Sequence, residues 1–296
     1  MALLALVVVT AIWGVTFVQV KDAVENYPLF AFLAVRFAIA TVTLAPFAVG
    51  RVRTLDRRGL AAGFGLGGLL AVGYALQTAG LSRTTVSSTG FITGLCVVLT
   101  PVTALVLFRH RIALSAWVGV VLATVGLAML SGIEAGSAVG DALVLGGALA
   151  YAVQIVLMER YAPDYDAVAL TLAEMIAALV GFTAIALALG DLSVPHGWTV
   201  WGALLVTGVF ASALAFLIQT WAQRRTSATR TALAFAAEPV FAGLFGYLLA
   251  GDRLGALGWA GCAVILAGIV VSEPSAARAL ASLGGRFRLS PSRPSN

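Results

Sequence analysis

Three ionisable side chains lie deep inside long apolar stretches of the chain: Arg36, Glu174 and Glu238. If these stretches cross a bilayer, each charge costs about 2.5–3.5 kcal/mol to insert, so such charges usually face protein and serve a function. A carboxyl group in this setting can exchange a proton or pair with a cation, and a guanidinium can attract a carboxylate or phosphate. The three residues therefore predict a polar site inside an apolar protein.

Glu238 is followed directly by Pro239 and lies about twelve residues, or roughly 18 Å of helix, inside its stretch. Proline removes a backbone donor and leaves carbonyl groups free beside the carboxyl group. Glu238 is expected to exchange a proton, to pair with a cationic substrate group, or simply to hydrogen-bond within the bundle. Pro101 is predicted to break another stretch in the same way, so Pro101, Glu238 and Pro239 are the predicted coupling or helix-break positions.

Arg36 and Glu174 occupy equivalent places when the sequence is shifted by 138 residues, a shift that also superposes Pro101 on Pro239. If the two copies cross the membrane in opposite senses, the two charges lie at opposite depths, and no direct ion pair is expected. Arg36 is then available either to attract an anionic or carboxylate group, or to hydrogen-bond carbonyl groups at a helix end.

Uncharged polar and aromatic residues within the apolar stretches could line a cavity for an amphipathic small molecule. Tryptophan and tyrosine near helix ends also serve as anchors at the membrane interface, which is the alternative reading of the aromatic residues. Together with Arg36, the residues expected to contact a substrate are Trp13, Tyr74, Gln77, Tyr151, Gln154 and Gln219.

The elements that carry these residues are membrane helices, because 60% of the residues are hydrophobic and only 10% are charged. The mean hydropathy is +1.00, whereas a soluble domain carries about 25% charged residues. A transmembrane helix needs about 20 mainly apolar residues. Ten such segments are predicted, at about 2–20, 28–49, 60–81, 84–108, 112–132, 142–158, 167–189, 197–221, 229–250 and 254–272.

An internal duplication organises these segments. Gln77–Gly126 lies over Gln219–Gly268 without a gap, and eleven of the fifty positions are identical. Five spans in each copy make an odd number, so the copies cross the membrane in opposite senses. The predicted fold is an all-α multi-pass membrane protein of two five-helix inverted repeats, residues 1–133 and 142–272, followed by a basic cytoplasmic tail at 273–296. This architecture is typical of secondary transporters, with a substrate site between the repeats near the midplane.

The distribution of basic residues predicts the orientation, because arginine and lysine favour the cytoplasmic face. With both termini inside, thirteen basic residues are cytoplasmic and three are external. The cytoplasmic ones are Arg51, Arg53, Arg57, Arg58, Arg109, Arg111, Arg160, Arg224, Arg225, Arg278, Arg286, Arg288 and Arg293. The external ones are Lys21, Arg83 and Arg253.

The sequence gives no sign of an enzyme, a cofactor site or a nucleic-acid interface. Its two cysteines, Cys96 and Cys262, lie in apolar stretches without metal-ligand spacing, and His110 and His196 lie in separate connections. No phosphate-binding loop, zinc-protease motif or nucleophile-elbow motif occurs. A non-transport membrane protein, such as a lipid-handling enzyme or a sensor subunit, remains an alternative, although the short connections leave no room for an extramembrane module.

Several short motifs resemble those of the EamA family of the drug/metabolite transporter superfamily. They are Trp13–Phe17 in the first span, Arg36 in the second, Thr84–Pro101 with its Gly90–Gly94 run, Glu238–Val240, and Gly251–Leu254 before a glycine-rich last span. Asp252 departs from the pattern, since similar sequences often carry glutamate there, and the matching connection of the first half has His110-Arg111 with no acidic residue.

The resemblance covers about residues 1–272 and implies a ten-helix carrier of the bacterial cytoplasmic membrane with both termini inside. It further implies transport of amino acids or related metabolites, usually outward. Coupling to protons is a separate expectation that follows from Glu238 and not from the resemblance. A carrier of phosphorylated or nucleotide-linked sugars from the same superfamily is the runner-up, but such substrates need several basic side chains at the cavity. Only Arg36 lies clearly within a span, and Arg230 lies near the start of another.

Overall fold

The computed structural model describes residues 1–131, 137–250 and 255–272, and all secondary structure within them is helical. The first half contains α1 (Ala2–Asn26), α2 (Leu29–Ala48), η1 (Val52–Thr54), α3 (Arg57–Leu81), α4 (Val86–Gly94), α5 (Cys96–Phe108) and α6 (Leu114–Ser131). The second contains α7 (Ala138–Tyr161), η2 (Ala162–Asp164), α8 (Ala167–Leu189), α9 (Trp198–Val206), η3 (Thr207–Leu214), α10 (Ala215–Gln223), α11 (Ala228–Phe235), α12 (Glu238–Phe245), η4 (Gly246–Ala250) and α13 (Ala256–Val271). The predicted tail and the Gly251–Leu254 motif lie outside the described residues.

These helices make ten apolar spans, as predicted. Among the described residues, eight segments are long and apolar enough to cross a membrane, and Ala2–Thr16 and Ala256–Val271 are shorter apolar helices. Spans four, eight and nine are each built from more than one helical piece: α4 with α5, α9 with η3 and α10, and α11 with α12 and η4.

The fourth span is interrupted at Leu95, and the prediction that Pro101 breaks it is wrong. Pro101 lies within α5, six positions beyond the interruption. A proline's fixed φ fits a helix, and packing within a membrane bundle compensates for its missing donor. The ninth span is interrupted between Phe235 and Glu238, so Pro239 occupies the first turn of α12, where a proline is well tolerated.

The positions at which the helices begin also correct the pairing of Pro101 with Pro239. α4 and α11 begin 142 residues apart, and so do α5 and α12. Glu238 is therefore the counterpart of Cys96, and Pro239 is the counterpart of Val97. The shift of 138 residues does hold for α2 and α8, which begin at Leu29 and Ala167, so the equivalence of Arg36 and Glu174 stands.

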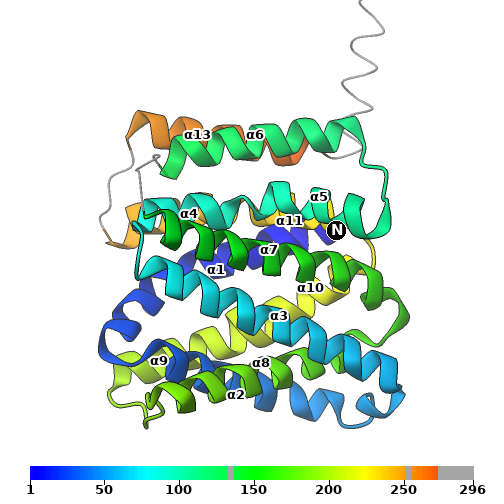
Figure 1. Ribbon diagram of the computed structural model, residues 1–296, viewed down its shortest axis with the longest axis vertical. Coiled ribbons are helices and arrows are strands. Elements are labelled where there is room, and N and C mark those ends of the chain that lie inside the picture. The colour runs from blue at the N-terminus through cyan, green and yellow to red at the C-terminus, as the bar shows by residue number, and fades with distance from the viewer. Residues whose placement is uncertain (132–136, 251–254, 273–296) are drawn as a thin grey trace, which may run out of the picture.

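The two halves interleave around a pseudo-two-fold axis. The most extensive helix contacts, α6 with α13, α3 with α7, α2 with α8 and α3 with α8, all join opposite halves. Two of these pairs, α6 with α13 and α2 with α8, join equivalent spans and lie at opposite ends of the longest axis of the molecule (Figure 1). An axis through both pairs runs across the helices, in the plane of the membrane.

Two glycine pairs show this symmetry at atomic scale where α6 crosses α13. A Cβ atom on Gly126 would lie 2.6 Å from the carbonyl oxygen of Gly261, and one on Gly119 would lie 2.6 Å from that of Gly268. Gly119 is the counterpart of Gly261, and Gly126 is the counterpart of Gly268, so the contact is reciprocal. Only glycine permits backbones to approach this closely in lipid.

The eighth span departs from the symmetry by a single residue. Its counterpart Arg57–Leu81 has 25 residues, whereas Trp198–Gln223 has 26. The middle of the longer span, η3, is a π-helix, in which backbone bonds run from residue i+5 to residue i, and Ala215 N accordingly donates to the Phe210 carbonyl. A wider turn accommodates an extra residue between fixed ends, so the extra residue explains the π-helix.

Candidate functional site

Glu238 lies where the broken ninth span turns in the interior of the bundle. It is the first residue of α12, so its carboxylate meets the positive end of that helix. The side chain is half-buried, and it interacts electrostatically with Arg36, Cys96 and Tyr151. Within the described part of the chain, its carboxyl group makes neither a hydrogen bond nor an ion pair. Glu238 is therefore free to accept a proton or a ligand group.

A second polar group joins the third, fourth and sixth spans beside Glu238. Tyr151 Oη donates to Gln77 Oε1 at 3.2 Å, and Gln77 Nε2 donates to Thr93 Oγ1 at 2.9 Å. Tyr74 packs edge-on against Tyr151, with ring centroids 5.6 Å apart. All four side chains are partly exposed, which suits the predicted contact of Tyr74, Gln77 and Tyr151 with a substrate.

The π-helical segment η3 binds both Trp13 and Arg36. Arg36 Nε donates to Ser212 Oγ at 2.7 Å, and its Nη2 donates to the Ala211 carbonyl at 3.2 Å. Trp13 Nε1 donates to the same carbonyl at 2.8 Å, and its ring packs on Phe235. Arg36 is 6% exposed, and in this conformation its guanidinium group bonds to a side chain and to a carbonyl group in the middle of η3. Its two predicted roles, attraction of an anionic group and hydrogen bonding to carbonyl groups at a helix end, stay predictions.

Gln154 and Gln219 lie in a buried network around Glu174 and do not face open space. Gln154 Nε2 donates to Glu174 Oε1 at 2.7 Å, and Gln219 Nε2 donates to Gln154 Oε1 at 3.2 Å. Gln219 Nε2 also donates to Gln223 Oε1 at 3.0 Å. The four side chains are at most 2% exposed. Their predicted contact with a substrate would therefore require a rearrangement of the helices.

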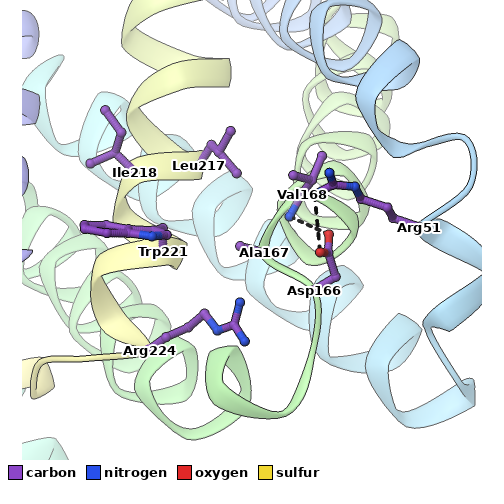
Figure 2. Close-up of a pocket in the computed structure, with 8 residues that line it drawn as sticks. All are labelled: Arg51, Asp166, Ala167, Val168, Leu217, Ile218, Trp221 and Arg224. Carbon is purple, nitrogen blue, oxygen red and sulfur yellow. Dashed lines mark hydrogen bonds and ion pairs between the residues drawn. The ribbon is translucent and has the colours of Figure 1, made fainter.

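Arg51, Arg160 and Arg224 lie at one end of the bundle, called the basic end, where a pocket of about 360 Å³ opens (Figure 2). Arg51 and Asp166 lie on one side of it, joined by an ion pair of 3.4 Å, and α10 forms the other side. Asp166 also caps α8 by accepting from Val168 N and Ala169 N. Apolar wall residues from α8 and α10 complete the pocket, together with Arg224. Among the described residues, the guanidinium group of Arg224 has no hydrogen-bond or ion-pair partner.

Most of these side chains could be predicted from the sequence, but which of them lie together could not. Trp13, Arg36, Tyr74, Gln77, Tyr151 and Glu238 lie where the two halves meet, and Gln154 and Gln219 belong to the separate network of Glu174. Ser212, Gln223 and the pocket residues were missed. The extra residue of the eighth span was a usable signal for the π-helix. The pocket brings together residues of α8, of α10 and of the connections beside them, and it leaves no sequence motif.

Comparisons with known proteins agree with this architecture. A profile described as the EamA-like transporter family matches residues 1–132 and again 138–272. A curated protein of Archaeoglobus fulgidus, named only as an uncharacterized transporter, is 32% identical over 268 residues, which cover 90% of this chain and 84% of that protein. A second uncharacterized transporter of that organism is 24% identical over 279 residues, which cover 90% of this chain and 97% of its own length.

A crystal structure shares the fold at low sequence identity. It superposes with a TM-score of 0.79 at 18% identity, over 94% of this chain and 98% of the other. At that identity the likeness concerns the fold alone. The family matches rest on the sequence and cover both halves separately, which agrees with two repeats of one ancestral unit.

Proposed function

The chain belongs to the EamA-like transporter family, and from that premise we propose that it is a secondary transporter which exports a small metabolite across the cytoplasmic membrane. The proposed substrate is an amino acid or a related compound. The proposed mechanism is alternating access, in which the two halves move against each other and expose one site to each side in turn. Both termini are cytoplasmic in this proposal.

The observation that carries the proposal is the position of Glu238. The carboxyl group is half-buried, lies at a helix interruption in the bundle interior, interacts electrostatically with Arg36 and Tyr151, and has no hydrogen-bond partner among the described residues. Interrupted helices in transporters typically present backbone groups and helix ends to a substrate near the midplane. An amino acid has both an ammonium group for Glu238 and a carboxylate for Arg36.

The residues around Glu238 supply the remaining contacts in this proposal. Trp13 and Tyr74 offer aromatic faces, while Gln77 and Tyr151 offer hydrogen-bonding groups that are already oriented by each other. Glu238 couples transport to protons by alternating between its acidic and ionised forms. Because Arg36 is bonded to Ser212 and to the Ala211 carbonyl in η3, its release towards a carboxylate requires these two hydrogen bonds to break.

The pocket at the basic end supports loading from the cytoplasm. Arg51 and Arg224 bring positive charge to a pocket that apolar side chains of α10 also line, and Asp166 brings negative charge. This combination fits an amphipathic zwitterion on its way into the bundle. Export requires substrate capture on the face that carries most of the basic residues, which is the proposed cytoplasmic face.

A carrier of phosphorylated or nucleotide-linked sugars is the second candidate. The observation that favours it is the pair of guanidinium groups, Arg51 and Arg224, in one pocket. Guanidinium groups bind phosphate strongly through paired hydrogen bonds. Arg51 is already paired with Asp166, however, so less positive charge is available than the two arginines alone would provide.

Flux measurements with purified protein in liposomes test the proposal. A panel of labelled amino acids, followed by sugar phosphates and nucleotide sugars, is offered with and without an imposed proton gradient. Amino-acid flux above protein-free liposomes is expected, and it should respond to the gradient. Flux of the phosphorylated compounds alone would replace the proposed substrate class with the second candidate.

A further inference from the structure

Glu174 is a buried carboxyl group that the proposed mechanism does not use. It is 0% exposed and lies in α8, well inside the membrane span. One of its oxygens, Oε1, accepts from Gln154 Nε2 at 2.7 Å. The other oxygen, Oε2, is buried without a hydrogen-bond partner. A buried polar atom without a partner is rare in folded proteins and calls for an explanation.

A second orphaned oxygen belongs to the same network. Gln219 Oε1 is also buried without a partner, although Gln219 Nε2 donates to both Gln154 and Gln223. Gln223 Nε2 in turn donates to the Ile155 carbonyl at 2.7 Å. The network thus contains two acceptor oxygens, each without a hydrogen-bond donor. A hydrogen on Glu174 makes its Oε2 a donor and leaves the carboxyl group uncharged.

No described cation neutralises Glu174. α8 packs on α2, α3, α10 and η1. The charged residue in the interior of α2 is Arg36, which bonds to Ser212 and Ala211. The charged residues of α3 are Arg57 and Arg58, and that of η1 is Arg53; all three lie towards the basic end. Residues 215–223 of α10 carry no charge.

α7, which supplies Gln154, brings no cation to Glu174 either. Its neighbouring titratable group, Tyr151, bonds to Gln77. At its far end Glu159 accepts from Ala228 N, and the arginine of this helix, Arg160, pairs with Asp164. An isolated ion in this setting carries a large desolvation cost, whereas a neutral acid with hydrogen bonds does not.

We infer that Glu174 is a proton-binding site, which holds a proton in the conformation described and exchanges it with water when the helices rearrange during transport. The inference rests on the proposed transport function for the exchange and on geometry alone for the bound proton. The two parts therefore have separate tests. The test of the bound proton needs only purified protein, and the test of its exchange needs flux measurements.

Infrared spectroscopy of the reconstituted full-length protein tests the bound proton. A neutral carboxylic acid has a C=O absorption that an ionised carboxylate lacks, and the wild type should show it at neutral pH. Glu174→Gln should remove the Glu174 component, while the matched change Glu238→Gln should leave that component in place. A spectrum unchanged by Glu174→Gln would overturn the inference.

A second variant keeps the test decisive if Glu174→Gln fails to fold. In Gln154→Leu the carbonyl oxygen Oε1 of Glu174 loses its donor, so the C=O band should move to higher wavenumber. A band that does not move belongs to another group, and this result would also overturn the inference.

Flux measurements test the exchange. Glu174→Gln imitates the protonated form permanently, so it should still exchange substrate down a concentration gradient but lose at least half of the acceleration by a proton gradient. Full acceleration in the variant would overturn the exchange. If the wild type shows the band but no flux of any compound, the proposed function fails while the proton site stands.

Discussion

Arg36 Nε and Ser212 Oγ lie 2.7 Å apart and join the second span to the π-helical segment of the eighth. Ser212 is 0% exposed, so Ser212→Ala leaves a guanidinium nitrogen without its acceptor in a place that water does not reach. Such an unpartnered group costs about 1–3 kcal/mol, more when it is charged. Unfolding in detergent micelles should show this loss of stability.

Ser82→Ala is the matched control for that measurement. Ser82 is exposed, and its hydroxyl group bonds only to the Ala79 carbonyl of its own helix. Its replacement should change stability by no more than about 0.5 kcal/mol. Equal losses in both variants would contradict the importance assigned to the bond between Arg36 and η3.

The crossing of α6 and α13 predicts a strong effect of a single methyl group. Gly126→Ala places a Cβ atom 2.6 Å from the Gly261 carbonyl oxygen and 2.8 Å from Ile265. Both are part of the facing helix, so the helices must separate, at a cost of about 1–3 kcal/mol. Gly65→Ala meets no atom within 4 Å and should stabilise α3 by up to about 1 kcal/mol. Thermal unfolding of the two variants should therefore shift in opposite directions.

The number of spans and their inverted arrangement could be predicted because both follow from sequence regularities. Span length follows from bilayer thickness, and the duplicated stretch preserves scarce residues at equivalent positions. The interruptions could not be placed as well, because proline is only one cause of a break. Pro101 fits inside α5, whereas the chain turns at Leu95, directly after Gly94.

The candidate site could be predicted by residue type but not by partner. Arg36, Glu174 and Glu238 stood out because charge is costly in an apolar span. That Glu174 meets Gln154, 20 residues away, depends on how α7 and α8 pack, which neither hydropathy nor spacing specifies. Gln219 joins them from a third span. Polar networks between helices are set by tertiary packing, so the sequence could not separate the buried network from the group around Glu238.

Glu238→Gln should abolish the response of flux to a proton gradient while leaving the fold intact. The side chain is half-buried and makes no hydrogen bond with a described residue, so an amide of the same shape breaks no observed hydrogen bond, although it removes the charge that faces Arg36. Flux driven by the substrate gradient should persist. Asp164→Asn, which removes a surface carboxylate paired with Arg160, is the control and should keep the response. Unchanged gradient dependence in Glu238→Gln would remove Glu238 from the coupling mechanism.

Asp56 predicts a pH dependence of stability at the start of α3. A hydrogen bond of 2.7 Å from Gly59 N holds the pKa of Asp56 below its ordinary value of 3.8, with a further contribution from the Tyr165 hydroxyl. Because the pKa is lowered by folding, this stabilisation is present above pH 3.8 and is lost as the pH falls through the lower, folded-state pKa.

Asp56→Asn isolates that effect, since asparagine also caps helices but does not titrate. The unfolding temperature of the wild type should exceed that of the variant at neutral pH, and the difference should shrink as the pH falls below 3.8. Curves that run parallel over the whole range would show that the Asp56 charge contributes nothing to stability.

Arg224→Gln tests whether the pocket at the basic end receives substrate. Arg224 lines the pocket without a partner among the described residues, so it is available to a substrate carboxylate. A charge-assisted hydrogen bond contributes about 1.5–3 kcal/mol, and its loss should raise KM roughly tenfold or more. The increase should occur when substrate is offered at the face that carries Arg224, and not at the opposite face.

Arg225→Gln removes the same charge from the neighbouring position. Arg225 stacks on the Trp221 ring at 4.5 Å, donates to the Trp221 carbonyl and does not line the pocket. KM should therefore change little in this variant. A rise of similar size in both variants would assign the effect to the net positive charge of this face, and Arg224 would then have no specific contact with the substrate.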